Sequence, residues 1–210
     1  MVFVICLCGP DGSGKSTIAR RLVLHFRMRH RCIRVIWLRG THTFASVLAR
    51  FLRTFSIFSG SCNPYYNICI PRGMKGLWIW IELLSILPVI LMRLVIPRLL
   101  GCVIIAERCL IDFLIWLIIT LKLSNVHSLI LSIILTLSKS LCSYTIYIRA
   151  DENVLLSRRR NVTERYLIPI ELRIYDKVTQ ILNVPHVDTT NKFVHESVRE
   201  VLEIIGRCHG

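Results

Sequence analysis

Acidic residues are scarce in this chain of 210 residues, in which 13 aspartates and glutamates are outnumbered by 27 lysines and arginines. The formal net charge is +14, and such an excess favours anionic partners, namely nucleotides, nucleic acid or an anionic membrane surface. The basic residues are scattered along the chain, and no RNA- or DNA-binding signature accompanies them. We therefore expect a nucleotide partner rather than nucleic acid.

A zinc-binding cysteine motif and a signal peptide are also missing from the sequence. The sequence has nine cysteines but no Cys-x-x-Cys pair, which argues against a zinc site. No segment at the start has the pattern of a signal peptide. We therefore expect a reduced, cytoplasmic protein in which Cys6, Cys8 and Cys102 are buried as small apolar residues.

An uninterrupted apolar run of about 18 residues, the length that a membrane-spanning helix needs, is missing too. Hydrophobic residues make up 53% of the chain, but the apolar segment 77–106 is interrupted by Glu82, Pro88 and Arg93, among others. We expect buried core helices, and peripheral contact with a membrane stays open as an alternative. The helices between residues 77 and 137 carry more apolar residues than one sheet face can cover, so we expect a homodimer through them.

Apolar segments of strand length alternate with segments of helical spacing along the whole chain. The expected strands cover residues 2–8, 33–38, 102–106, 144–148 and 186–189, and a long helix over 77–99 is expected to be kinked or interrupted at Pro88. Strands separated by helices imply right-handed crossovers and a parallel sheet covered on both faces. We predict a single α/β domain over residues 1–210, a three-layer sandwich with a parallel sheet of about five strands.

A phosphate-binding loop follows the first expected strand. Residues 9–17 read Gly-Pro-Asp-Gly-Ser-Gly-Lys-Ser-Thr, a complete G-x-x-x-x-G-K-[ST] motif between a strand and a helix. Glycines let the backbone N–H groups turn toward an anion, and the new helix points its positive end at the same place. We expect Lys15 to reach the β- and γ-phosphates of ATP and the Ser16 hydroxyl to bind Mg²⁺. The residues expected to bind the nucleotide are Gly9, Pro10, Asp11, Gly12, Ser13, Gly14, Lys15, Ser16 and Thr17.

Charged residues follow two further strands, at the edge where ligands bind in open parallel sheets. Arg39 follows the second strand, and its planar, permanently charged group suits a phosphate monoester. At the end of the third strand, Glu107 can hold the hydration shell of Mg²⁺, and Arg108 can hold a transferred or accepting phosphate. Asp11, inside the phosphate-binding loop, could accept hydrogen bonds from the hydroxyl groups of an acceptor. Asp11 could instead make a turn contact, Arg39 could lie on the surface, and Glu107 and Arg108 could form an ion pair at the sheet edge.

A cluster of arginines can supply the positive charge that phosphoryl transfer needs. Arg158, Arg159 and Arg160 are followed by Arg165, and a lid segment at about 157–170 that folds over bound nucleotide would exclude water. We expect these four arginines, with Lys15 and Arg108, to act in catalysis. They could instead form the solvated face of a charged helix.

In these features the chain resembles the thymidylate kinase family of P-loop nucleoside-monophosphate kinases, over essentially its whole length. The resemblance implies ATP- and Mg²⁺-dependent phosphoryl transfer to a (deoxy)nucleoside monophosphate, dTMP first, with a short arginine lid. It places Asp11 near the acceptor sugar, and Arg39 and Arg108 on the acceptor phosphate. It also implies that residues 187–189 lie near the base of ATP.

The chain departs from the family's pattern at several positions. Glu107 and Cys109 stand where the family has an aspartate and an aromatic or histidine, and Ile18 replaces a frequent glutamine. Glu107 and the following arginine also resemble a signature of deoxynucleoside kinases, which need a carboxylate base after the second strand. Arg39 stands there instead, and the next acid is Glu82, so we favour an anionic monophosphate acceptor.

A phosphate-binding loop also occurs in proteins with different activities. The sequence is compatible with a small-molecule or polynucleotide 5′-kinase, with an NTP-binding switch, and with a membrane- or nucleic-acid-associated ATPase. The first of these differs in its acceptor, and the last two need no acceptor at all.

Overall fold

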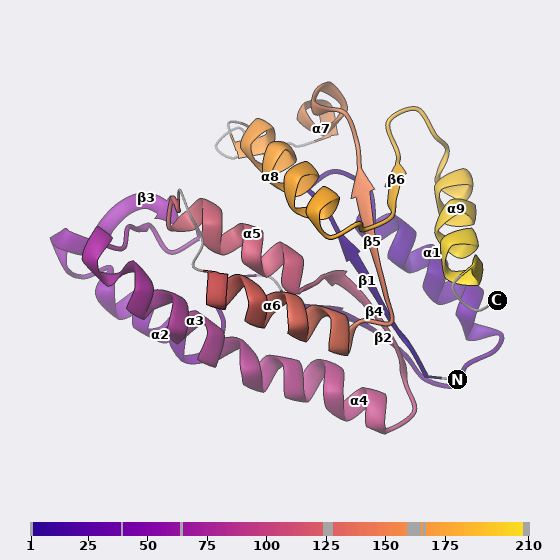
Figure 1. The fold of residues 1–210 in the computed structure, drawn as a ribbon, viewed down its shortest axis with the longest axis horizontal. Coiled ribbons are helices and arrows are strands. Elements are labelled where there is room, and N and C mark those ends of the chain that lie inside the picture. The colour runs from indigo at the N-terminus through magenta and orange to yellow at the C-terminus, as the bar shows by residue number, and fades with distance from the viewer. Residues whose placement is uncertain are drawn as a thin grey trace.

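The computed structural model describes residues 2–38, 40–63, 65–123, 128–158, 165 and 167–207. Their centre is a five-stranded sheet with the strand order β2-β4-β1-β5-β6, in which all pairs are parallel (Figure 1). Its strands are β1 (Val4–Cys8), β2 (Ile33–Trp37), β4 (Val103–Arg108), β5 (Tyr144–Arg149) and β6 (His186–Asp188). The expected α/β fold with a five-stranded parallel sheet is confirmed. A further short strand, β3 (Ser59–Asn63), lies outside this sheet.

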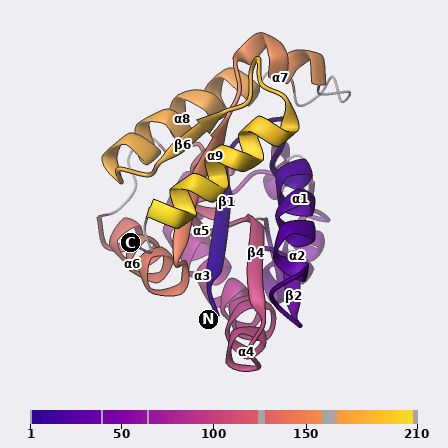
Figure 2. The same cartoon turned by 90° about the vertical axis from the view of Figure 1, so that its right-hand side faces the viewer.

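Helices cover both faces of the sheet because both faces of its central strand are apolar. In β1, Ile5 and Leu7 pack toward α1 (Lys15–Arg27) and α9 (Val194–Arg207), which lie in front of the sheet in Figure 2. Cys6 and Cys8 join the core on the opposite face. The remaining helices are α2 (Thr43–Leu52), α3 (Lys75–Ile90), α4 (Ile96–Leu99), α5 (Leu110–Thr120), α6 (Ser128–Leu141), α7 (Glu152–Arg158) and α8 (Ile168–Ile181). Such two-sided burial is typical of parallel sheets.

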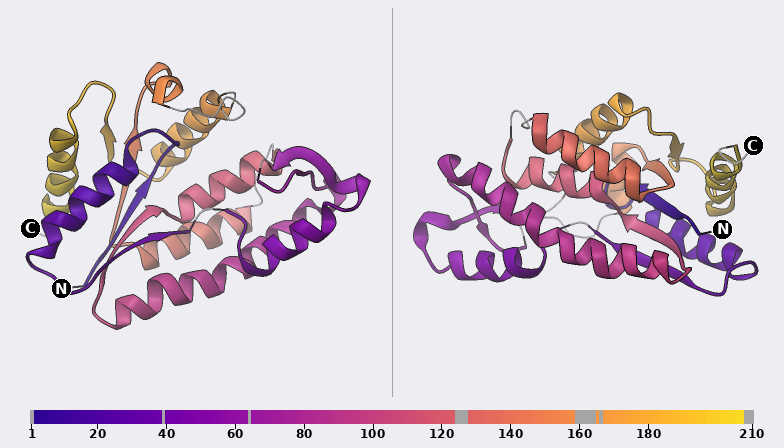
Figure 3. Two further views of the ribbon diagram at one scale, coloured as in Figure 1. Left: turned by 180° about the vertical axis from the view of Figure 1, so that it is seen from behind. Right: turned by 60° about the horizontal axis from the view of Figure 1, so that its bottom comes forward.

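The helix expected over 77–99 is present and does not end at Pro88. It runs as a single rod from α3 through a π-helical turn at Leu91–Val95 into α4 (Figure 3). Proline lacks the N–H that would bond one turn back, and the wider turn follows directly after it. Among the described residues, the helical segment Arg72–Leu99 is long and apolar enough to cross a membrane, with a mean hydropathy of 2.2 over 18 residues. Only 39% of that window is buried inside the protein.

Six of the eight cysteines that the structure describes form disulfides, namely Cys6–Cys142, Cys32–Cys102 and Cys62–Cys69. The expected reduced state is therefore wrong for these six cysteines, which include Cys6 and Cys102, whereas Cys8 is a buried thiol as expected, and so is Cys109. The sheet register explains one pair, because β2 and β4 pair from Ile33 and Val103 onward, and Cys32 and Cys102 precede these residues. The cytoplasmic location stays a prediction.

Glu82 lies on the inner side of α3, where its carboxylate accepts a hydrogen bond of 2.8 Å from the Thr41 hydroxyl. Burial raises the pKa of Glu82 to about 7, and the hydrogen bonds from Thr41 and Trp78 lower the pKa only in part. Between the unfolded and folded pKa values, the folded protein binds more protons than the unfolded chain. The contribution of Glu82 to the free energy of unfolding therefore falls as the pH rises from about 4.5 to about 7.

Replacing Glu82 by Gln keeps the size of the side chain and removes this titration. We expect the unfolding free energy of Glu82→Gln minus that of the parent protein to increase as the pH rises from about 5 to about 8. The increase should be at most about 3 kcal/mol. Thermal unfolding across this pH range measures the difference. Glu152→Gln, at an exposed position of α7, is the control and should show no such trend. Parallel stability curves for the parent protein and Glu82→Gln would contradict the raised pKa.

Candidate active site

Three glycines shape the loop between β1 and α1. Gly9, Gly12 and Gly14 have φ values of 144°, 92° and 93°, in a region that side chains disfavour. A Cβ atom on Gly9 would lie 2.2 Å from the carbonyl oxygen of Ile148 in β5. Position 9 therefore has room only for glycine, because the loop leaves β1 in close contact with the end of β5.

Lys15 points into this loop and is buried. Its Nζ donates hydrogen bonds to the carbonyl oxygens of Gly9 and Pro10, at 2.7 and 2.5 Å, and to Ser13 Oγ at 3.3 Å. These contacts hold the ammonium group at the N-terminal end of α1. The helix dipole and the first backbone N–H groups of a helix favour an anion at the same place.

Glu107 and Arg108 end β4 and, as neighbours in a strand, they point to opposite faces of the sheet. Glu107 faces α1, and its Oε2 accepts a hydrogen bond of 2.7 Å from the Ser16 hydroxyl. Hydroxyl and carboxylate oxygens are ligands that Mg²⁺ prefers, and this ion keeps several waters. The pair therefore fits the expected magnesium site. Among the described residues there is no group of three or more His, Cys, Asp and Glu side chains that could hold a metal.

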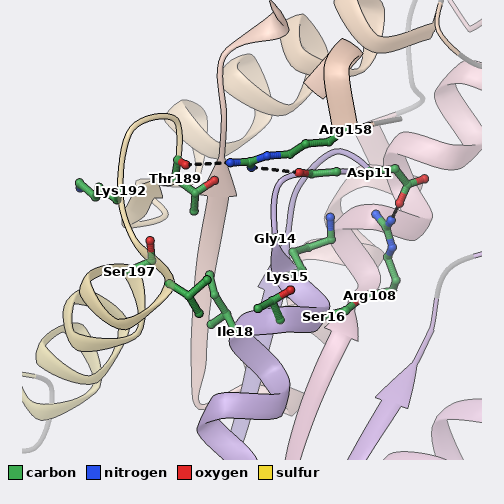
Figure 4. A pocket seen from close by; sticks show the side chains of 13 residues that line it. Asp11, Gly14, Lys15, Ser16, Ile18, Arg108, Arg158, Thr189, Lys192 and Ser197 are labelled. Atoms are coloured by element: carbon green, nitrogen blue, oxygen red, sulfur yellow. Dashed lines mark hydrogen bonds and ion pairs between the residues drawn. The ribbon is translucent and has the colours of Figure 1, made fainter. Parts of the chain in front are cut away.

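Arg108 faces the other side and is buried beside the loop. Its guanidinium forms an ion pair with Asp11 (Figure 4) and donates to the carbonyl oxygen of Gly9 at 2.9 Å. It also donates to Asp112 Oδ1 at 3.3 Å. Two predicted site residues, Asp11 and Arg108, are thus in direct contact.

Asp112 was missed by the sequence analysis. It is completely buried in the first turn of α5 and accepts three further hydrogen bonds, from Gly9 N at 3.2 Å, Cys109 N at 2.8 Å and the Tyr175 hydroxyl at 2.6 Å. The carboxylate thereby connects the phosphate-binding loop to α5 and α8. One signal in the sequence could have identified it. Asp112 is the single charged residue in the apolar segment 109–121, and it stands three residues after Cys109, which is the spacing of a helix capping box.

Arg158, at the end of α7, lies over the loop (Figure 4). It donates to the carbonyl oxygens of Gly12 and Thr189, at 3.3 and 3.4 Å. Thr189 follows β6 and donates from its hydroxyl to the carbonyl oxygen of Ser13 at 2.9 Å. The end of the last strand of the sheet is therefore joined to the loop. That residues 187–189 lie near the base of ATP stays a prediction.

Several other predicted site residues are placed differently or not described. Arg165 donates to the carbonyl oxygen of Leu156 at 3.0 Å and, among the described residues, is not one that lines the cavity over the loop. Arg159 and Arg160, near the start of the expected lid, lie outside the described residues, as does Arg39. Their roles stay predictions.

Two cavities meet at the pair formed by Asp11 and Arg108. The first, of about 460 Å³, lies over the loop and the start of α1 (Figure 4), and we name it the donor cavity after the ATP that the sequence predicts there. The second, of about 290 Å³, lies toward the end of β2, and we name it the acceptor cavity after the predicted acceptor. Beside the shared pair, the donor cavity is lined by Lys15, Ser16, Arg158, Thr189, Lys192 and Ser197, among others, and the acceptor cavity by Trp37, Gly40, Thr41, Tyr65 and Tyr66.

No protein-family model and no curated protein sequence matches the chain. Solved structures do match it over nearly the whole length of both chains. A deoxyadenosine kinase from M. mycoides with bound dCTP matches with a TM-score of 0.52 and 14% identity, covering 97% of this chain and 99% of that chain. A thymidylate kinase from Ehrlichia chaffeensis matches with a TM-score of 0.56 and 12% identity, with coverages of 97% and 98%.

The YorR protein from Bacillus subtilis, in complex with phosphorylated GDP, matches with a TM-score of 0.55 and 16% identity, with coverages of 98% and 97%. At such identities the likeness is one of fold. The chain therefore has the α/β P-loop fold of these three structures, as the loop and the order of elements predict.

Proposed function

We propose that this protein is a kinase that transfers the γ-phosphoryl group of ATP to the phosphate of a (deoxy)nucleoside monophosphate, with dTMP as the first candidate. The observation that carries the proposal is the pair of cavities on the two sides of Asp11 and Arg108. Phosphoryl transfer requires a donor and an acceptor that are held next to each other. An NTP-binding switch or an ATPase needs the donor cavity alone.

The donor cavity has the charges that the triphosphate of ATP needs. Lys15 and Arg158 bring positive charge from two sides of the loop, and the N-terminus of α1 adds its dipole. Ser16 and Glu107 would hold Mg²⁺, which when bound neutralises charge on the phosphates. Because phosphoryl transfer needs little covalent help, such positioning and charge supply most of the catalysis.

The acceptor cavity suits a nucleotide. Its aromatic side chains, Trp37, Tyr65 and Tyr66, offer flat surfaces for a base, and Arg108 offers a cation for a phosphate. Arg108 is held in place by Asp11 and Asp112, so its position does not have to be set when the substrate binds. We propose that Asp11 contacts the acceptor sugar and that Arg39 adds a second cation at the acceptor phosphate.

A nucleoside is the second candidate acceptor, and Glu82 is the observation that favours it. Glu82 accepts a hydrogen bond from Thr41, which stands 41 positions earlier in the chain. Thr41 lines the acceptor cavity. A carboxylate close to the end of β2 is what activation of a neutral hydroxyl requires. However, Glu82 is only 1% exposed and is not among the described residues that line the cavity. Arg108 does line it, and we therefore prefer the monophosphate.

Replacing Lys15 by Ala tests the donor site. We expect Lys15→Ala to lower the rate of ADP release in the presence of acceptor by at least about a hundredfold, because positive charge at the transferring phosphate is lost. Lys192→Ala is the matched control, since Lys192 lines the same cavity but is paired with Glu200 at 2.6 Å. It should retain most of the activity. Turnover like that of the parent protein from a folded Lys15→Ala variant would refute the assignment.

An acceptor screen tests the substrate class. ADP release is compared for the four deoxynucleoside monophosphates, the ribonucleotides, free nucleosides and a 5′-hydroxyl oligonucleotide. We expect monophosphates to react faster than nucleosides, and Arg39→Ala to abolish this preference because a cation at the acceptor phosphate is lost. Faster reaction of free nucleosides would identify a nucleoside kinase instead. ATP hydrolysis that lipid or nucleic acid stimulates without any acceptor would indicate an ATPase.

Replacing Asp112 by Asn tests whether this residue positions Arg108. The variant keeps the shape of the side chain but removes one of the two negative charges at the Arg108 guanidinium. We expect the KM for the acceptor to rise by about tenfold or more, with a smaller change in the KM for ATP, because a small displacement of a positioning group is costly. A purely structural role would lower thermal stability and leave the ratio of the two KM values unchanged.

A further inference from the structure

The outer side of α3 is apolar over about four turns. From Leu77 to Met92, a range that is described throughout, every exposed residue is apolar. We call this set, Leu77, Trp80, Leu84, Leu87, Pro88, Leu91 and Met92, the apolar stripe. Leu84, Leu87 and Leu91 are 54%, 48% and 51% exposed. Their spacing of three and four residues places them along one side of the helix. Because the outer side of a surface helix is normally polar, the stripe is expected to be covered by a partner.

The inner side of the same helix is packed into the protein. Trp78, Leu83, Ile86 and Ile90 are buried and belong to the core cluster that also contains residues of β1, β4 and α5. The helix is therefore bound along its length to the domain, although its length and composition would allow it to cross a membrane. A helix held in this way lies along a surface rather than across a bilayer.

The charges around the stripe have one sign. The range 43–100 contains six basic residues, Arg50, Arg53, Arg72, Lys75, Arg93 and Arg98, and one acidic residue, Glu82. Glu82 is buried on the inner side, so the exposed charges of this range are positive. A second copy of the chain would bring the same positive charges and no acid to neutralise them. Anionic lipid headgroups, in contrast, are attracted to basic residues beside an apolar face.

A small apolar crevice opens beside the stripe, between α3 and α6. Its volume is about 120 Å³, and all the residues that line it are apolar, including Trp80, Leu84 and Leu87 of the stripe and Ile133, Ile134 and Leu137 of α6. A crevice without polar groups gives a polar ligand no hydrogen bond, whereas it can accept part of a hydrocarbon chain.

We propose that the apolar stripe and its basic neighbours dock on the surface of an anionic lipid bilayer, with α3 lying in the plane of the interface and the crevice accepting part of an acyl chain. The donor cavity remains open in this arrangement. It lies near α7 and the connection from β6 to α9, at the top of Figure 1, whereas α3 and α4 form the lower edge of the molecule.

Co-sedimentation of the full chain with lipid vesicles tests the proposal. Vesicles of phosphatidylcholine alone are compared with vesicles that also contain phosphatidylglycerol, at low and high salt. We expect binding at least about tenfold stronger to the anionic vesicles, and weaker binding at high salt because the headgroup charges are screened. The anionic vesicles also serve to compare two variants with equal changes in charge.

The double variant Leu87→Glu/Leu91→Glu places two carboxylates on the stripe, and we expect it to lose at least about tenfold in binding. The matched control, Leu24→Glu/Met28→Glu, has the same spacing and the same change in charge. Leu24 is 54% exposed and lies on α1, on the other face of the sheet, and Met28 is 89% exposed and directly follows this helix. We expect it to bind more strongly than the stripe variant. Thermal unfolding and ATP binding establish that both variants are folded.

Three results would overturn the proposal. In the first, the parent protein stays in solution with anionic vesicles at low salt, an outcome that needs no variant to fold. In the second, both double variants lose binding equally, so that net charge alone explains it. In the third, sedimentation equilibrium without lipid shows a dimer that Leu87→Glu/Leu91→Glu dissociates. The stripe would then be covered by a second copy, as the homodimer expected from the sequence requires.

Discussion

Asp112 is buried where the phosphate-binding loop, α5 and α8 meet, and its carboxylate joins groups that are far apart in the sequence. It accepts hydrogen bonds from Gly9, Cys109 and Tyr175 and pairs with Arg108. A buried carboxylate is stable only when donors and a counter-charge surround it. Each of these partners is therefore constrained in position by the others. The start of the loop and the guanidinium shared by the two cavities are fixed by the same interaction.

Two neighbouring residues of β4 with different proposed roles lie on opposite faces of the sheet. Glu107 and Arg108 are neighbours at the end of β4, and strand geometry directs one toward α1 and the other toward α5. Glu107 consequently meets Ser16, where oxygen ligands suit a metal ion, and Arg108 meets Asp11, where a cation suits a phosphate. Two adjacent side chains with opposite charges thus serve different parts of one proposed reaction instead of neutralising each other.

Features that depend on neighbouring residues could be predicted from the sequence. β1 and the first part of β4 are continuous apolar segments, and the loop has its complete motif between a strand and a helix. Contacts between distant positions could not be predicted. The bond from Gly9 to Asp112 spans 103 positions, that from Tyr175 to Asp112 spans 63, and that from Thr41 to Glu82 spans 41. The disulfides and the passage of the long helix through Pro88 likewise depend on tertiary packing, which overrides local preferences.

The strand order has a consequence for how the chain reaches its native state. β1 precedes the other four strands of the sheet in the sequence, but its partners are β4 and β5, so that Ile5 lies beside Ile105 and Tyr144. An apolar central strand therefore stays unpaired until about a hundred later residues have been made. Pairings of such long range slow folding, and an exposed apolar strand is a site for aggregation and for chaperone binding. The phosphate-binding loop, which directly follows this strand, is thus synthesised well before the strands that fix its starting point.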